Sequence, residues 1–575
     1  MKPKSIGSVF IAVVACSWVI SSHSQIPDFA WTLISERSTD EWAYANAAFG
    51  VAVDAQNNLI VSGAASGPIS LGEKTSSCAT LCALLTKVTS TGTVVWLNRL
   101  EAAETVVAPV FQRNVALDAQ GNVFVCGTFS GTFSLPGKTI TTIGLDGYVA
   151  KYDAAGSLLW LQLLSGDADD LAESLTVDQA GNCYVLGDLW RSGPVSPLPT
   201  TVFEDIPVTT VDGGWYSEYL VKLSPDGVKL RTKIFGYVGP DSPGGRPFGR
   251  SITLDRSGNI HVCGALHGPV LFDGIPLGDS LPFEDNSGFA GGAFLLKYDP
   301  DWNLLWAKDA TGPAAGTLGV FNDVKTDQEG NCFVTGFFRS PHQVGADQLP
   351  TYGEWDFWLA KFSPSGNVLW ARSGGGAGID SGERLAINSS GDCIVTGYFQ
   401  GAATFAGTNF TSEGLQDLFV TKYTKHGEPV WFKQLGAASA AYTGLGISLD
   451  SAGNAFLAGS VVTNAVLTEG GFVTSRNPLE NPGDIFLAKL AVGGGSSVVN
   501  TNSHVGILQV GRDSSQIVLS WPIAISNVVL ETSHALDSSA DWQSVTIQSQ
   551  TISDRFVVRL SPEQTAAFFR LRKTQ

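Results

Sequence analysis

The sequence predicts an all-β protein, a seven-bladed β-propeller closed by an N-terminal strand and followed by a small C-terminal β-sandwich. Three observations predict it. A strand–turn–strand motif occurs seven times, a second strand pair follows each copy, and the last copy lacks a strand that the start of the chain supplies. Repeats of 60 to 77 residues built from strands indicate propeller blades rather than helical solenoids.

The first residues have the pattern of an export signal. Lys2 and Lys4 precede an apolar run, and small polar residues follow up to Ser24. This order predicts a secretory signal peptide over residues 1–24. A lipoprotein acylated at Cys16 is a second interpretation, which the apolar SWVI segment after that cysteine disfavours. We therefore expect a mature protein that is secreted, at the cell surface or in the periplasm, without a transmembrane segment.

The recurring motif is VALDAQGNVFVCG at 115–127. Its Asp118 is expected to open a type I turn and to accept backbone N–H groups, and Gly121 supplies the positive φ. An EF-hand loop would need oxygen ligands at alternating positions and a downstream Glu, which no copy has. The motif is therefore predicted to be a turn, and no metal site is expected. The turn-opening residues are Asp54, Asp118, Asp178, Asp255, Asp327, Asn388 and Asp450.

The second signature, GYVAKYDAAGSLLW at 147–160, places one lysine on the third strand and a tryptophan on the fourth. A ring of lysines could bind an anion, but strand alternation favours a solvated stem or a partner carboxylate. The lysines are Lys87, Lys151, Lys222, Lys297, Lys361, Lys422 and Lys489. The tryptophans are Trp96, Trp160, Trp306, Trp370 and Trp431, with Leu230 in the corresponding place of the third repeat.

The seventh repeat ends after Lys489 and runs into a Gly/Ser/Asn linker at 494–504. The segment PDFAWTLIS near the N-terminus has the missing strand, with Trp31 in register. We therefore expect the N-terminal strand to complete the seventh blade and to remove an exposed sheet edge. The propeller is predicted over residues 25–493.

The repeat D-x-x-G-N-x-[FY]-V-x-G, followed by D-x-F-[LV]-x-K-[YF] and G-x-x-x-W, resembles the SBBP beta-propeller repeat of bacterial secreted and surface proteins. The resemblance covers about residues 27–493 in seven copies. It implies a propeller in an extracellular setting. It implies no particular activity and no catalytic residues.

The tail at 505–575 alternates like the strands of a small sandwich, with Trp521 and Trp542 as expected core residues. It is similar to C-terminal modules of large secreted bacterial proteins, for which a sorting or interaction role and a plain folded cap both stay open.

The cysteines divide into two groups. Cys78 and Cys82 lie in one loop and could form a disulfide in an oxidising compartment. The others are expected to be small buried hydrophobic residues of strands, and they are Cys126, Cys183, Cys263, Cys332 and Cys393.

Composition excludes some functions. The net charge of −18 disfavours nucleic acid and anionic membrane surfaces as partners. No HExxH spacing, G-x-S-x-G elbow or cofactor motif occurs, so no cofactor is expected and a catalytic role is disfavoured without being excluded.

If both tight turns of every blade lie on one face, the long second-to-third links and the blade connections lie on the other. Aromatic residues on these variable links, Trp215, Tyr216, Tyr352 and Trp355, predict a recognition surface. The alternative is that they fold back and cover blade edges.

The same face holds the mouth of the central channel. The residues expected at its rim are Phe49, Arg113, Glu173, Arg250, Asn322, Glu383 and Leu445. This mixed ring of charges could bind a small molecule or peptide, or could merely solvate a channel. The sequence thus favours an exported scaffold that binds a protein or glycan through its loop-rich face, and the alternative is a propeller hydrolase or lyase acting at the channel mouth.

Overall fold

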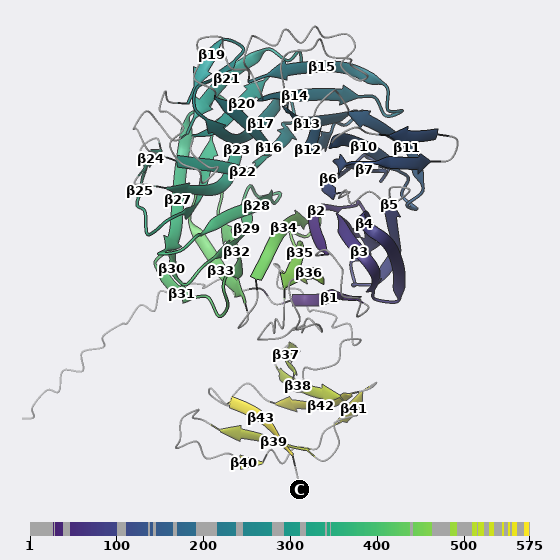
Figure 1. The fold of residues 1–575 in the computed structure, drawn as a ribbon. Coiled ribbons are helices and arrows are strands. Elements are labelled where there is room, and N and C mark those ends of the chain that lie inside the picture. The colour runs from purple at the N-terminus through teal and green to yellow at the C-terminus, as the bar shows by residue number, and fades with distance from the viewer. Residues whose placement is uncertain are drawn as a thin grey trace, which may run out of the picture.

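The computed structural model describes the propeller and the strands of the C-terminal module (Figure 1). The described residues are 27, 29–37, 46–100, 111–135, 138–141, 145–164, 170–190, 216–236, 245–278, 292–310, 318–339, 342–344, 347–436, 441–462, 484–491, 509–513, 516–522, 528–533, 543–544, 550–552, 555–560 and 568–573. The predicted signal peptide lies outside them. The described part contains no helix long and apolar enough to cross a membrane.

Seven antiparallel four-stranded blades surround a central axis, which confirms the predicted fold (Figure 1). The innermost strands are β2 (Ala47–Val53), β6 (Phe111–Leu117), β12 (Asp170–Val177), β16 (Arg246–Leu254), β22 (Leu318–Thr326), β28 (Ser381–Ile387) and β34 (Ala441–Leu449). The second strands are β3 (Leu59–Leu71), β7 (Val123–Phe129), β13 (Cys183–Trp190), β17 (Ile260–His267), β23 (Cys332–Arg339), β29 (Cys393–Phe399) and β35 (Ala455–Val462).

The outer half of each blade follows the same order. The third strands are β4 (Lys74–Val88), β10 (Asp146–Tyr152), β14 (Tyr216–Leu223), β20 (Ala293–Tyr298), β26 (Asp356–Phe362), β32 (Asp417–Tyr423) and β36 (Asp484–Leu490). The fourth strands are β5 (Val94–Leu100), β11 (Leu158–Leu164), β15 (Lys229–Phe235), β21 (Leu304–Asp309), β27 (Val368–Gly376), β33 (Pro429–Leu435) and, for the seventh blade, β1 (Phe29–Arg37).

The N-terminal strand closes the ring as predicted. Strand β1 pairs antiparallel with β36, and Trp31 lies opposite Lys489. Its C-terminal end then pairs with β3 of the first blade, where Ser35 lies opposite Leu71. One strand therefore joins the last blade to the first.

Several second-to-third links fold into outer hairpins. They are β8 (Thr132–Leu135) with β9 (Lys138–Thr141), β18 (Val270–Phe272) with β19 (Ile275–Leu277), β24 (His342–Val344) with β25 (Asp347–Leu349), and β30 (Ala402–Phe405) with β31 (Thr408–Thr411). Strand β30 of the sixth blade pairs with β27 of the fifth. The sixth-blade link thus covers part of the outer edge of the fifth blade.

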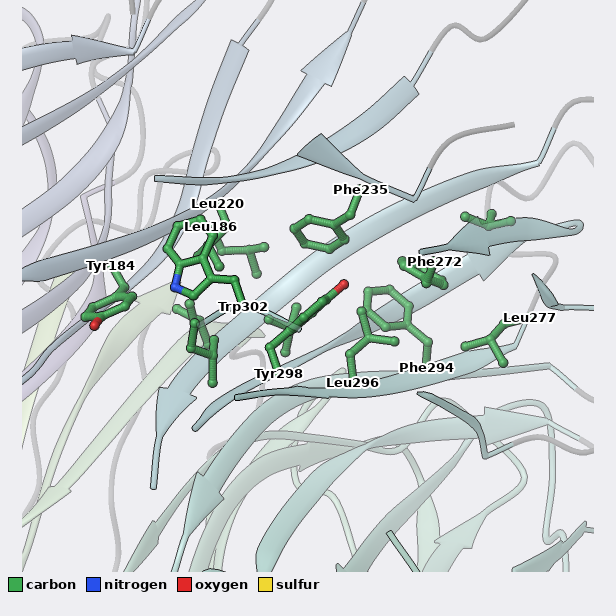
Figure 2. Packing of buried hydrophobic residues seen from close by; sticks show 14 of the residues in the cluster. Tyr184, Leu186, Leu220, Phe235, Phe272, Leu277, Phe294, Leu296, Tyr298 and Trp302 are labelled. Atoms are coloured by element: carbon green, nitrogen blue, oxygen red, sulfur yellow. The ribbon is translucent and has the colours of Figure 1, made fainter. Parts of the chain in front are cut away.

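Among the described residues, seven clusters of buried apolar side chains fill the seven seams between blades. Figure 2 shows the seam in which Leu220 and Phe235 of the third blade meet Phe272 and Leu296 of the fourth. Burying a large apolar side chain contributes about 1.5–3 kcal/mol, so the seams hold the ring together. The described part has no single central core.

The seven motifs are turns. In the fifth blade, Asp327 Oδ1 accepts the backbone N–H groups of Glu329 and Asn331 at 3.0 and 2.9 Å. The Asn331 side chain donates to Asp327 Oδ2 at 2.8 Å. The predicted positive φ is present, 79° at Gly121 and 61° at Asn57.

The seven lysines pair with carboxylates of these turns, one of the two fates predicted for them. The N–O distances lie between 2.9 and 3.7 Å, and the pairs are Lys87–Asp54, Lys151–Asp118, Lys222–Asp178, Lys297–Asp255, Lys361–Asp327, Lys422–Asp392 and Lys489–Asp450. In the sixth blade the order is exchanged, because Asn388 opens the turn and Asp392 supplies the carboxylate.

Trp31, Trp160, Trp306 and Trp370 each donate a hydrogen bond from Nε1 to a turn carbonyl of the next blade, whereas Trp96 Nε1 is buried without a partner. Trp370 Nε1 donates to the Lys425 carbonyl at 3.1 Å, and the same carbonyl accepts from Lys361 Nζ at 3.4 Å. Trp31 does the same across the closure, donating to the Ser90 carbonyl at 2.9 Å.

The third blade departs from this pattern, and the prediction for Leu230 is wrong. Arg231, not Leu230, lies opposite Lys222, and Leu230 is 53% exposed. In the facing turn of the fourth blade, Trp302 occupies the glycine position with φ 61°. The Arg231 guanidinium stacks on the Trp302 ring at 4.9 Å. The indole has therefore moved from the strand to the facing turn.

Cys82 is disulfide-bonded, whereas the side chain of Cys78 lies outside those described. The five cysteines predicted to be buried in strands are buried, and none of these five forms a disulfide. Burial raises the pKa of Cys332 to about 12, which makes it a poor nucleophile.

The C-terminal module is built from strands. One sheet contains β37 (Gln509–Asp513), β38 (Gln516–Pro522), β42 (Arg555–Leu560) and β41 (Gln550–Ile552), and the other contains β40 (Gln543–Ser544), β39 (Val528–Ser533) and β43 (Phe568–Lys573). Trp521 belongs to β38, and Trp542 lies outside the described residues. Face-to-face packing of the sheets stays a prediction.

Two glycine substitutions separate backbone strain from seam packing. Gly121→Ala should cost about 1–2 kcal/mol of unfolding free energy, because the new Cβ keeps an ordinary 3.8 Å from Ala154 and only the left-handed backbone is strained. Gly427→Ala should cost more, because its Cβ would lie 2.7 Å from the Trp370 ring of the neighbouring blade. Denaturant titration measures the unfolding free energy of both variants. Equal losses of unfolding free energy would contradict the close contact between Gly427 and the Trp370 ring.

Asp327→Asn should cost about 3 kcal/mol at pH 7, because it leaves the buried Lys361 ammonium without its carboxylate. The double variant Asp327→Asn/Asn331→Asp reproduces the order found in the sixth blade and should recover most of that loss. Denaturant titration tests this, and a double variant as unstable as the single one would contradict the exchange.

The same variants should show how the free energy of unfolding depends on pH in the acid range. Burial alone would raise the pKa of Asp327, but hydrogen bonds from Asn331 and Lys361 outweigh it and hold the pKa below 3.8. Its contribution is therefore complete above about pH 4 and is lost as the pH falls through the folded pKa. The gap between wild type and Asp327→Asn should narrow in unfolding curves measured below about pH 3, and a constant gap would contradict this assignment.

Candidate functional site

The predicted rim residues occupy one structural position, a β-bulge in each inner strand. The pairing register shifts around Phe49, Arg113, Glu173, Arg250, Asn322, Glu383 and, in a two-residue step, Leu445. A bulged residue leaves the ladder and its side chain is re-aimed. The sequence therefore identified seven equivalent positions near the axis.

The structure brings some of these residues together. Glu383 accepts hydrogen bonds from Ser381 Oγ at 2.7 Å and from Asn322 Nδ2 at 3.4 Å across adjacent inner strands. Glu173 and Arg250 are half-buried. The side chains of Arg113 and Leu445 lie outside those described. In the described part, Arg250 of the fourth blade and Glu383 of the sixth are not paired with each other.

A buried carboxylate that the sequence analysis missed lies beside this ring. Asp323 accepts from Ser251 Oγ of the fourth blade at 2.6 Å and from the Leu385 N–H of the sixth at 3.0 Å. Burial would raise the pKa of Asp323, but the charges of Lys325 and Arg384 outweigh it and lower the pKa. Asp323 therefore cross-links three inner strands and has a structural role.

The predicted recognition residues divide between described and undescribed segments. Tyr352 is 42% exposed. Trp355 is half-buried, with its ring edge-on to Phe337 at 5.1 Å and beneath the Arg339 guanidinium at 5.8 Å. Trp215 lies outside the described residues, and Tyr216 begins β14 with its side chain outside those described. The structure therefore places one exposed aromatic ring on the loop-rich face.

Two aspartates hold the turn that carries Tyr352 and Trp355. The Tyr352 N–H donates to Asp356 Oδ2 at 2.8 Å, and the Asp380 N–H donates to the Trp355 carbonyl at 2.8 Å. Burial raises the pKa of Asp356 to about 6. Burial and the neighbouring Asp356 raise the pKa of Asp380 to about 7. The turn is therefore fixed at the seam between the fifth and sixth blades.

A further carboxyl with a shifted pKa lies in the third blade. Glu218 is fully buried, lies opposite Asp188 on the neighbouring strand, and accepts the Gly249 N–H at 2.6 Å. Burial and then the Asp188 charge raise the pKa of Glu218 well above its ordinary value. A carboxyl whose pKa is raised holds its proton to higher pH, as a general acid must, so Glu218 is one described residue with a property suited to acid–base chemistry.

Among the described residues, no group of three or more His, Cys, Asp and Glu side chains is arranged to hold a metal ion. Asp356 stands at the Asp position of the D-x-F-[LV]-x-K-[YF] signature, but the sequence did not show which groups surround it. Asp323 and Glu218 could not be identified from the motif, because Ser251, Leu385 and Gly249 reach them from other blades.

Comparison with known proteins agrees with this architecture. The family model described as SBBP, Beta-propeller repeat, matches residues 430–460, which run from β33 to β35. The predicted resemblance is thereby confirmed. An uncharacterised WD repeat-containing protein of Acanthamoeba polyphaga mimivirus is 22% identical over 446 residues, which are 65% of this chain and 31% of that protein. The regulatory protein FlaEY of Caulobacter vibrioides is 30% identical over 133 residues, 22% of this chain and 13% of that protein.

The chain thus spans less than a third of the length of these curated relatives. Among solved structures, a protein of unknown function from Dyadobacter fermentans has a TM-score of 0.37 at 11% identity and covers 80% of this chain and 98% of its own. The quinohemoprotein alcohol dehydrogenase ADHIIG of Pseudomonas putida has a TM-score of 0.34 at 10% identity, over 84% of this chain and 79% of its own. The chain is a seven-bladed β-propeller, and its segment 430–460 matches the SBBP repeat model.

Proposed function

We propose that this chain is an exported, non-enzymatic scaffold that binds a protein or a carbohydrate through its loop-rich face. The observation that carries the proposal is the exposed Tyr352 ring on a turn that two buried aspartates hold in place. Aromatic side chains on rigid supports supply contact area at low entropic cost, which is the requirement for a recognition surface.

The opposite face supports this choice. There the polar side chains of the tight turns bind one another, since each lysine is paired with a turn carboxylate of its own blade. Such a face repeats seven times and offers little variation for recognition. The second-to-third links of the loop-rich face differ from blade to blade, and variable loops on a rigid scaffold commonly carry binding.

Charge narrows the class of ligand. The net charge of −18 repels strongly anionic partners, so we infer a neutral carbohydrate or a neutral or basic protein surface. Export to the cell surface, the periplasm or the medium is part of the proposal. It is supported by the N-terminal signal pattern and by the disulfide at Cys82, because disulfides persist in oxidising compartments.

The test is a screen of the mature protein on glycan and protein arrays, followed by affinity measurements. Tyr352→Ala and Trp355→Ala should each weaken binding at least about tenfold, since an aromatic hot spot is worth about 1.4 kcal/mol or more. Trp215→Ala tests the third-blade link in the same way. Leu369→Ala is the control, because Leu369 is also exposed, at 52%, but lies on an outer strand of the same blade. Equal loss in the control, or no loss at Tyr352 and Trp355, contradicts the proposal.

A hydrolase or lyase near the axis is the second candidate, and the observation that favours it is Glu218, a buried carboxyl with a raised pKa that accepts the Gly249 N–H next to the bulged Arg250. An activity screen would support it if turnover appears in wild type and is abolished in Glu218→Gln and Arg250→Ala. Turnover unaffected by both substitutions would remove this candidate.

A further inference from the structure

The seam between the fifth and sixth blades contains two facing carboxylates. Asp356 is the first residue of β26, Asp380 directly precedes β28, and both are fully buried. A Cβ added to Gly375 would lie 2.8 Å from Asp380 Oδ2 and would contact Asp356 Oδ1. The two carboxylates therefore converge on one point above the Gly375 backbone.

One of the four carboxylate oxygens of this pair accepts no hydrogen bond. Asp380 Oδ2 accepts the Gly376 N–H at 2.6 Å, and Asp380 Oδ1 accepts the Gln400 N–H at 3.2 Å. Asp356 Oδ2 accepts the Tyr352 N–H. Asp356 Oδ1 is buried without a partner and faces the convergence point. A buried carboxylate oxygen without a partner costs free energy unless a donor or a cation meets it.

Asp356 and Asp380 differ from the aspartates of the tight turns. Each of those has a lysine ammonium within 3.7 Å, whereas no Lys, Arg or His of the described residues lies within ion-pair distance of Asp356 or Asp380. Two like charges in a seam of low dielectric repel each other strongly. A positive charge from outside the chain would remove that repulsion.

We propose that Asp356 and Asp380 bind a hard divalent cation, Ca²⁺, at the seam between the fifth and sixth blades. The donors are oxygens only, with no thiolate or imidazole, which is the set that Ca²⁺ prefers. Ca²⁺ also tolerates irregular geometry and completes its shell with backbone carbonyls and water, so two carboxylates suffice as the charged ligands. Mg²⁺ demands near-ideal octahedral geometry and is disfavoured by this irregular seam.

Other seams of the propeller have residues at the positions of Asp356 and Asp380. Asp146 and Asp170 occupy the same positions at the seam between the second and third blades, where the Asp170 N–H donates to the Leu145 carbonyl at 2.7 Å. At the seam between the seventh and first blades, Asn46 stands eight residues before its turn aspartate, as Asp380 stands before Asn388. An amide is therefore compatible with this position, and Asp380→Asn is expected to fold.

The bound cation would fasten the turn that carries Tyr352 and Trp355, because Asp356 accepts from that turn and Asp380 donates to it. Cation binding itself needs no protein or glycan ligand. If no cation binds, the proposed recognition function is unaffected. If no protein or glycan binds, the proposed cation site is unaffected.

The experiment measures thermal unfolding of the mature protein at pH 7.5 after EDTA treatment, with CaCl₂ or MgCl₂ added back, and Tb³⁺ luminescence sensitised by tryptophan. We expect 1 mM Ca²⁺ to raise the Tm of wild type by roughly 2 °C or more, with a smaller effect of Mg²⁺. Asp356→Asn and Asp380→Asn should lose one equivalent of bound Tb³⁺ and the Ca²⁺-dependent rise. Glu354→Gln is the matched control, since it removes an exposed charge from the same turn and should keep both.

Several results would overturn the proposal. One is a wild-type Tm that ignores Ca²⁺ but rises between pH 7.5 and 5 in a manner lost in Asp380→Asn, which would mean that the pair holds a proton. Another is a Ca²⁺ effect and a Tb³⁺ stoichiometry that are equal in all variants. If the Asn variants do not fold, Gly375→Ala decides the question, because its methyl group would occupy the convergence point while both charges remain. Undiminished Tb³⁺ binding in Gly375→Ala would also refute the site.

Discussion

One lysine ammonium per blade, buried or half-buried, determines how the rest of the propeller fits together. In the fifth blade, Lys361 Nζ lies 2.9 Å from Asp327 Oδ2 of its own blade and 3.4 Å from the Lys425 carbonyl of the next. Burying an ion pair brings little net stability, since desolvation offsets the attraction. Its effect is on register, because a one-residue slip of the third strand would carry the lysine to the opposite face of the sheet.

The exceptions show that the contact matters more than the residues that make it. The sixth blade exchanges the acid and the amide of the turn and still gives its lysine a carboxylate at 2.9 Å. The seam between the third and fourth blades moves the indole from strand to turn, and Arg231 stacks on Trp302. Both cases conserve the physical requirement, a carboxylate for the lysine and an aromatic ring against the turn, while the chain positions change.

Much of what short-range patterns encode was predicted from the sequence. The turn at Asp118, the positive φ of Asn57 and the closing strand with Trp31 follow from spacing and alternation within a few residues. Leu230 was misassigned, although the spacing G-x-x-x-W counted from Gly227 ends at Arg231 and the bulge after the lysine is the same in the other blades. The pair Asp356 and Asp380 was also missed. These residues lie on different blades, and only the seam brings their carboxylates to one point.

The closing strand has a consequence for how the molecule is made. Strand β1 leaves the ribosome first, yet its partner β36 is the last strand of the propeller to be synthesised. At typical elongation rates the early segment waits roughly 20–90 s for that partner. During this interval strand β1 and the outer part of β3, with which β1 later pairs, have unpaired backbone groups. Such open edges are prone to pairing with other chains. Holding the nascent chain apart from its copies until its two ends meet is thus a requirement that this topology imposes on the producing cell.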